Sequence, residues 1–179
     1  ISLGLDHIKP AERTGEEITP TEFKQWLDEG REVAIIDTRN DYEIRLGTFE
    51  NALDLNIKSF RAFPKAVESL PDSMKDTPVV MFCTGGIRCE KASAYFKHKG
   101  FKNVYQLEGG IIEYARQVKE QELKNNFVGK NFVFDQRKAE RISEDVISRC
   151  HQCGKKSDTH VNCLNEACHL LFIQYAIKR

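Results

Sequence analysis

Apolar residues in the first two thirds of the chain gather in short continuous runs, separated by stretches of mixed polarity. Residues 33–37, 78–82 and 103–107 are each dominated by aliphatic and aromatic side chains. Strands of a parallel sheet have this composition because helices cover both of their faces. We therefore expect three buried strands at these positions.

The mixed stretches between these runs favour helices. Residues 18–30 open with a threonine and a proline suited to a helix start, and they close on a glycine suited to a helix exit. Residues 89–99 and 111–122 are also expected to be helical. Strands that alternate with helices predict an α/β domain with a mostly parallel sheet flanked by helices. Ligands of such sheets bind beyond the carboxyl ends of the strands, where Asp37 and Cys83 lie.

The alternation stops after residue 119. Residues 124–130 resemble a linker, and residues 131–135 are expected to form a short strand. We find no repeats or low-complexity tracts. The chain has no initiator Met, and its opening residues lack the cationic start and apolar core of a signal peptide, so we expect a fragment of a longer protein.

The net charge and the lengths of the apolar runs argue against two classes of protein, general nucleic-acid binders and membrane-spanning proteins. The 27 basic and 27 acidic residues balance, which argues mildly against a general nucleic-acid binder. No apolar run approaches the ~20 residues of a membrane span. The six cysteines fall into two separate groups in a chain large enough to fold without disulfides, which favours a reducing, cytoplasmic location.

The first cysteine group lies in the segment from Cys83 to Arg88, between a predicted strand and a predicted helix. A helix N-terminus presents free N–H groups and a partial positive charge, which favour thiolate over thiol. Such settings lower a cysteine pKa from about 8.5 to roughly 3.5–7.5. Gly85 and Gly86 let several amides face one point, and Arg88 adds fixed charge. We interpret this loop as a cradle for an anionic sulfur. The alternative is a buried core thiol beside a tight turn.

Several stretches carry a resemblance to the rhodanese family. They are residues 34–39 followed by Tyr42, Glu43 and Gly47, residues 51–57, the Cys83 loop, and residues 104–110. The resemblance covers residues 15–122 and implies a rhodanese-like domain there. Residues 1–14 would form an N-terminal extension or linker, and residues 123–179 a C-terminal extension. Four residues separate Cys83 from Arg88, whereas related phosphatases carry five, so the loop favours sulfur over phosphate chemistry.

A longer stretch, residues 82–93, together with the C-terminal cysteines, resembles the bacterial tRNA uridine(34) hydroxylase family. That resemblance implies oxygen-dependent formation of 5-hydroxyuridine at the tRNA wobble position, with the anticodon region of tRNA as partner and O2 as co-substrate. It also implies an N-terminal domain that precedes the present chain. By this resemblance Cys83 is the catalytic residue, in an active-site loop of Thr84, Gly85, Gly86, Ile87 and Arg88.

Three further residues are candidates for supporting roles. Cys89 falls in the first turn of the predicted helix, where it serves either as a relay thiol or as a packing residue. Asp37 and Arg39 follow the neighbouring strand. Asp37 is a candidate acceptor for loop hydrogen bonds and Arg39 a candidate source of charge, but a structural ion pair is the better interpretation of Asp37.

The second cysteine group comprises Cys150, Cys153, Cys163 and Cys168. Two closely spaced pairs of this kind are typical of a structural zinc site, whose four ligands leave no position open for catalysis. Two disulfides, free thiols and an iron–sulfur cluster remain alternatives. His151, His160 and His169 are candidate substitute ligands, and Lys155, Lys156, Lys178 and Arg179 leave the tail slightly basic.

Three functions are compatible with these features. The first is the tRNA uridine hydroxylase. The second is a sulfurtransferase in which Cys83 carries sulfane sulfur as a persulfide, and the third is a non-catalytic binding module. No glycine-rich dinucleotide fingerprint is visible, so we predict neither NAD nor flavin. The sequence predicts no oligomeric state.

Overall fold

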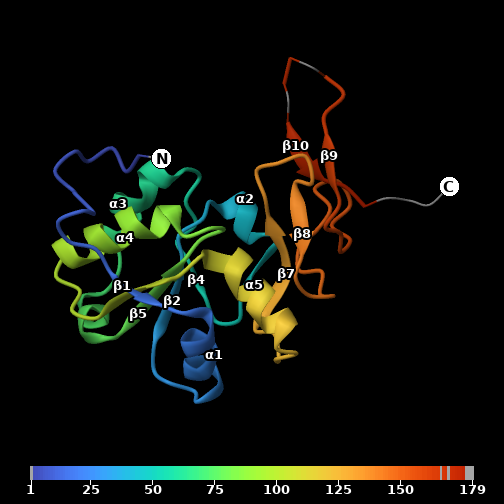
Figure 1. Cartoon of the computed structure of the whole chain (residues 1–179). Helices are drawn as coiled ribbons and strands as arrows, with labels where there is room; N and C mark the ends of the chain where they lie inside the picture. Colours follow the sequence, from blue (N-terminus) through green and yellow to red (C-terminus); the bar gives the residue numbers. More distant parts are fainter. Residues whose placement is uncertain (1, 166, 169, 176–179) are drawn as a thin grey trace.

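A five-stranded parallel sheet forms the centre of the computed structural model, which describes residues 2–165, 167–168 and 170–175 (Figure 1). His169, Lys178 and Arg179 lie outside the described residues. The strand order is β1-β6-β5-β2-β4. The strands are β1 (Glu16–Ile18), β2 (Ala34–Asp37), β4 (Leu53–Asp54), β5 (Val79–Phe82) and β6 (Val104–Leu107). The three predicted buried strands and their parallel pairing are therefore confirmed.

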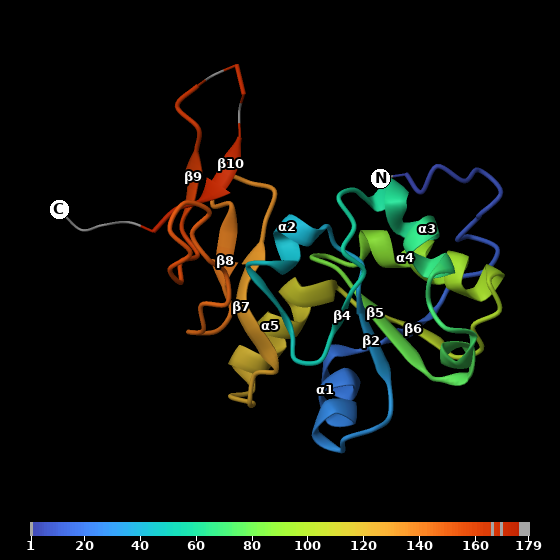
Figure 2. The ribbon, with the colours of Figure 1, turned by 180° about the vertical axis from the view of Figure 1, so that it is seen from behind.

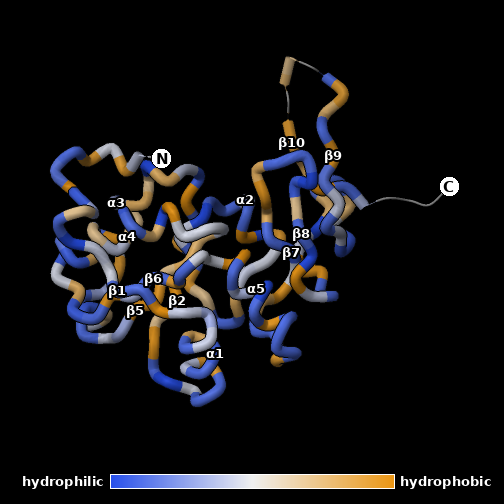
Figure 3. Tube along the Cα trace, in the orientation of Figure 1, coloured by the Kyte–Doolittle hydropathy of each residue, from blue (hydrophilic) through white to orange (hydrophobic). Residues whose placement is uncertain are grey.

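Helices cover both faces of this sheet (Figures 1 and 2). Helices α1 (Pro20–Asp28) and α5 (Gly110–Glu120) pack on one face, and α3 (Phe63–Glu68) and α4 (Ile87–His98) on the other. Successive strand residues point to opposite faces, so Ile35 joins the α1/α5 core while Ile36 joins the α3/α4 core. Hydrophobic positions accordingly concentrate along the central strands (Figure 3).

The three predicted helices are confirmed, with small shifts at their ends. Thr19 caps α1 in a reciprocal capping box with Glu22, as the sequence of this turn indicates. Three shorter elements connect the layers. They are α2 (Asp41–Ile44) and the 3₁₀ turns η1 (Phe60–Ala62) and η2 (Asp72–Asp76).

A second, antiparallel sheet joins the C-terminal part of the chain to the first part. Strand β7 (Phe127–Phe132) lies between β3 (Gly47–Phe49) and β8 (Ala139–Arg141). The predicted linker at 124–130 is therefore wrong from residue 127 onward, and the strand predicted at 131–135 begins and ends earlier than expected. Gly129 and Asn131 are buried within β7 and conceal its alternation, while the Phe127 ring packs 5.3 Å from that of Phe49.

A small hairpin follows this sheet. Strand β9 (His160–Asn162) pairs with β10 (Leu171–Ile173), and an isolated bridge joins Arg149 to Lys156. Leu46, Phe132 and Ile173 form a minor core that connects the hairpin with β7 and with the turn between α2 and β3. Among the described residues, no helix is both long enough and apolar enough to cross a membrane.

Candidate active site

The loop after β5 wraps around the sulfur of Cys83. The chain leaves the strand at Cys83, turns at Gly86 in the left-handed region (φ 92°) and enters α4 at Ile87. The N–H of Gly86 donates to Sγ of Cys83 at 3.0 Å. The Cys83 side chain is buried, with 1% of its surface exposed. The Gly86 amide thus faces the sulfur, in the manner that the cradle interpretation predicts.

The start of α5 fixes the opposite side of this loop. The N–H groups of Ile111 and Ile112 donate to the carbonyls of Cys83 and Thr84 at 3.0 and 3.2 Å. A side chain on Gly110 would place its Cβ 2.5 Å from the Cys83 carbonyl oxygen, so this approach requires a glycine. Because α5 binds the loop carbonyls, loop amides remain free to face the sulfur.

The electrostatics of this cradle favour the Cys83 thiolate. The Cys89 thiol donates a hydrogen bond to Cys83, and this bond outweighs the effect of burial. With the added charge of Arg88 and the loop amides, it lowers the pKa of Cys83 to about 6. Burial and the neighbouring Cys83 raise the pKa of Cys89 well above its ordinary value, so Cys89 stays protonated. Cys89 also lies 3.8 Å from Oγ1 of Thr38.

Arg88 is held by a carboxylate to which the sequence assigned no role. Its two terminal nitrogens donate to the Oε2 and Oε1 atoms of Glu43 at 2.6 and 2.8 Å. Glu43 is fully buried and also accepts the N–H of Asn40 at the start of α2. The Asn40–Glu43 spacing indicates helix capping, but only the fold brings α2 against the Cys83 loop. Bidentate pairing fixes the guanidinium and balances its charge.

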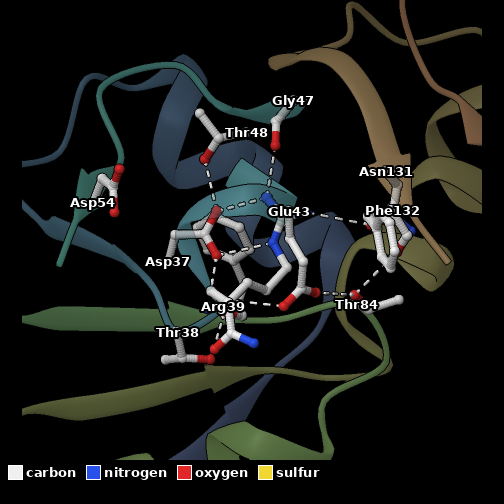
Figure 4. A network of polar contacts seen from close by, with 12 residues as sticks. Asp37, Thr38, Arg39, Glu43, Gly47, Thr48, Asp54, Thr84, Asn131 and Phe132 are labelled. Carbon is white, nitrogen blue, oxygen red and sulfur yellow. Dashed lines mark hydrogen bonds and ion pairs between the residues drawn. The ribbon is translucent and has the colours of Figure 1, made fainter. Parts of the chain in front are cut away.

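Asp37 and Arg39 form a separate buried ion pair behind this site (Figure 4). Arg39 Nη2 donates to Asp37 Oδ2 at 2.6 Å and to the Gly47 carbonyl at 2.7 Å. Asp37 also accepts the hydroxyl of Thr48 at 2.8 Å. Among the described contacts, neither side chain touches the Cys83 loop, so their geometry is that of a structural pair joining β2 to β3.

A cavity of about 580 Å³ opens above Cys83. Arg61 and Arg88 line it, and the described lining includes no Asp or Glu. Its other described lining residues are Ser2, Asn40, Tyr42, Ser59, Phe60, Thr84, Gly85, Ile87 and Phe134. Phe134 is 67% exposed, and the Arg88 guanidinium lies 5.9 Å from its ring centre. The cavity thus combines an activated thiolate, two cations and aromatic walls. The sequence did not predict Tyr42 or Phe134 as site residues.

A second cavity of about 350 Å³ adjoins the first at Tyr42. His160 lines this second cavity with Arg45 and His151, and its ring centre lies 5.7 Å from that of Phe132. Burial and nearby cations lower the pKa of His160, so its imidazole is neutral near pH 7. His160 therefore belongs to the neighbouring cavity rather than to the described lining of the Cys83 cavity.

The C-terminal cysteines form two close pairs. Cys150 lies beside Cys153, and Cys163 lies beside Cys168. All four are free thiols. Within the described ranges, no group of three or more His, Cys, Asp or Glu side chains is close enough to hold a metal ion. The pairs have the donor chemistry of a zinc site, but the structure does not bring them to one point, so the four-cysteine site stays a prediction.

Two family models match the chain. Residues 19–117 match the model described as "Rhodanese-like domain", and residues 128–176 match the one described as "Rhodanase C-terminal". The first match covers the Cys83 loop and Glu43. The second covers Phe134 and the four C-terminal cysteines.

Several curated proteins are similar over most of the chain. A protein of Photorhabdus laumondii named tRNA uridine(34) hydroxylase is 57% identical over 163 residues, which are 90% of this chain and 46% of the relative. A protein of the same name from Pectobacterium carotovorum is 62% identical over 144 residues, which are 80% of this chain and 40% of that relative. The chain thus spans about half the length of these relatives.

A solved structure supports the same fold. A crystal structure of a Bacillus halodurans protein superposes with a TM-score of 0.51 at 17% identity, covering 69% of this chain and 88% of that one. The likeness extends to the fold alone.

Proposed function

The chain belongs to the rhodanese-like domain family, and from that premise we propose that Cys83 is the catalytic nucleophile of a tRNA uridine hydroxylase. In this proposal the full protein converts the wobble uridine of tRNA to 5-hydroxyuridine with O2. The names of the relatives support the substrate. The observation that carries the proposal is the position of Cys83, whose sulfur accepts the N–H of Gly86, at the base of a large, partly aromatic cavity.

The loop chemistry suits addition to a uracil ring. A thiolate is a soft nucleophile, and C6 of uracil is the electrophilic end of its conjugated double bond. Formation of a bond between Sγ and C6 makes C5 electron-rich, and C5 can then bond to one oxygen atom of O2. The second oxygen atom leaves as water, which requires two electrons from an external reductant. Loss of the C5 proton and of the thiolate restores the aromatic ring.

Sulfurtransfer is the second candidate, and the cradle itself favours it. Amides and Arg88 that stabilise a thiolate also stabilise a persulfide on Cys83. The cavity size argues for the first candidate, because thiosulfate needs little of a 580 Å³ space, whereas that volume lies within the usual range for larger organic ligands.

The deciding experiment expresses the full-length protein in a strain without its own homologue and measures tRNA nucleosides by mass spectrometry. We expect 5-hydroxyuridine-derived nucleosides with the wild type and none above background with Cys83→Ser. Unchanged nucleosides in Cys83→Ser would reject the catalytic assignment. Robust Cys83-dependent transfer of sulfur from thiosulfate to cyanide, without tRNA modification, would support the sulfurtransferase instead.

We further propose that the C-terminal cysteines bind one structural zinc, with Cys150, Cys153, Cys163 and Cys168 as its ligands. Spacing and donor type support this site, and closure of two pairs around one ion requires the pairs to approach each other. Zinc binding in such small sites contributes on the order of 10 kcal/mol. We expect elemental analysis of the purified protein to give one zinc per chain, and chelation to lower its melting temperature. Iron with acid-labile sulfide would contradict the assignment.

The substrate also suggests the setting of the protein. We propose that it acts in the cytoplasm, where tRNA is modified, and that it contacts the anticodon region.

A further inference from the structure

We propose that the Cys83 cavity binds a single nucleotide of an RNA loop, with its base on Phe134 and its phosphate on Arg61. The inference rests on the proposed function and deepens it, because it assigns the binding residues. It starts from the charge, the exposed aromatic surface and the size of the cavity.

The positive charge in the lining of the cavity favours an anionic ligand. Arg88 is buried, its two terminal nitrogens donate to Glu43, and its charge acts on Cys83, so it is not free to bind a further anion. Arg61, on the turn η1, is exposed and makes no ion pair or side-chain hydrogen bond within the described part of the chain. Because no carboxylate belongs to the described lining, Arg61 is the cation most available to a phosphate. Ser59, two residues earlier, adds a hydroxyl beside it.

The exposed aromatic surface of the cavity favours binding of a nucleobase. Phe134 keeps 67% of its surface open and Ile87 keeps 66%, and both line this cavity, so its rim carries more than one exposed apolar side chain. Buried Phe132 supports Phe134 at a ring distance of 5.0 Å and supports Tyr42 at 5.4 Å. Rings held in this way lose little freedom on binding, and bases of unpaired RNA stack on such rings.

The size and position of the cavity select one nucleotide rather than a duplex. A volume of about 580 Å³ accommodates a nucleotide but no paired helix. Chemistry on a base needs the base outside its stack, and a base in an RNA loop reaches that state at low cost. Phe134 follows β7 and belongs to the segment matched by the second family model. The catalytic loop and the stacking wall therefore come from different parts of the chain.

Binding measurements on the 179-residue chain can test the two contacts separately. The ligands are a labelled RNA hairpin with one loop uridine, the same hairpin with that base removed, and free uridine monophosphate. Fluorescence anisotropy over a salt series gives affinity and its salt slope. All proteins carry Cys83→Ser so that no reaction interferes. Phe134→Ala is compared with Leu123→Ala, and Arg61→Ala with Arg61→Lys and Arg13→Ala.

We expect Phe134→Ala to weaken the uridine hairpin about tenfold and to abolish its advantage over the abasic hairpin, with an unchanged salt slope. Arg61→Ala should reduce the magnitude of the salt slope by about 0.7 and leave the base preference intact, and Arg61→Lys should restore the slope. Leu123→Ala and Arg13→Ala should behave as the parent protein.

Equal binding of all variants would overturn the nucleotide site. Equal binding of the uridine and abasic hairpins by the parent protein, or binding of free uridine monophosphate as tight as that of the hairpin, would overturn it as well. The proposed function fails in a different way. If the binding pattern appears as expected but tRNA hydroxylation does not depend on Cys83, the binding site stands and the catalytic assignment falls. If hydroxylation depends on Cys83 while Phe134→Ala and Arg61→Ala bind RNA as the parent protein does, the catalytic assignment stands and the nucleotide-binding site falls.

Discussion

Two cysteines, one in the loop after β5 and one in the first turn of α4, share the work of a single reactive group. Cys83 holds the negative charge, and Cys89 stays protonated and donates the hydrogen bond that stabilises this charge most. Cys89 is fully buried on α4 and faces the loop from inside the core. The sequence left two roles open for this helix-start cysteine, relay thiol or packing residue, and the geometry supports a third, that of a positioning residue.

Removal of the Cys89 thiol should therefore raise the pKa of Cys83 from about 6 towards the ordinary value of a cysteine. The thiolate fraction grows as the pH rises through the pKa, so alkylation of Cys83 in the wild type should reach half its maximal rate near pH 6. In Cys89→Ala the midpoint should move to higher pH. Peptide-level mass spectrometry after brief exposure to iodoacetamide reports Cys83 separately from the other cysteines.

Cys89→Ser is the matched control, because its hydroxyl retains a donor at the same position. We expect its midpoint to lie closer to that of the wild type. A midpoint near pH 6 in Cys89→Ala would mean that Arg88 and the loop amides suffice to stabilise the thiolate.

At the scale of elements, the contact between β3 and β7 depends on two glycines that face each other. Gly47 and Gly129 are register partners. A Cβ on Gly129 would lie 2.2 Å from the Leu46 carbonyl oxygen, and one on Gly47 would lie 2.4 Å from that of Lys130. The atoms that such a Cβ would meet belong to the backbone and cannot move aside as the end of a flexible side chain can. Glycine at both positions therefore allows the close approach of the two strands, and a side chain at either one would push them apart.

Gly129→Ala should lower the free energy of unfolding by roughly 3 kcal/mol, because it adds a backbone clash to the strain of a positive φ. Gly30→Ala is the matched control. Gly30 also has a positive φ (64°), but its Cβ would meet no atom within 4 Å, so only about 1 kcal/mol should be lost. Urea denaturation measures the free energy of unfolding of both variants. Similar losses in the two variants would show that the β3–β7 approach is not tight.

The same strands show where sequence reasoning succeeds and where it stops. Strands β2 and β5 are buried on both faces, so their continuous apolar runs identify them without ambiguity. Strand β7 alternates phenylalanine, glycine and asparagine at its buried positions. Its glycine is required by a neighbour 82 residues away in sequence, at Gly47, and no local pattern contains that information.

At the scale of the whole molecule, the site joins segments that are distant in sequence. The Cys83 loop could be predicted because a strand, a glycine turn and a helix N-terminus are local features with a direct chemical consequence. The roles of Glu43, Arg61 and Phe134 could not, because each reaches the site only through tertiary packing; the sequence around Glu43 indicates a family signature and a helix cap, but no contact with Arg88. Asp37 and Arg39 illustrate the converse case, since their suggestive position at a strand end serves a structural ion pair.

The late position of Phe134 has a consequence for the order of events during synthesis. A chain emerging from the ribosome presents residue 83 well before residue 134, and folding of domains begins at the N-terminus. The reactive sulfur and its amide cradle can therefore form while the stacking wall is still untranslated, and while β3 still lacks its partner β7. A nascent chain at that stage would hold the Cys83 cradle without Phe134, so the proposed nucleotide site would be complete only after residue 134 has been synthesised.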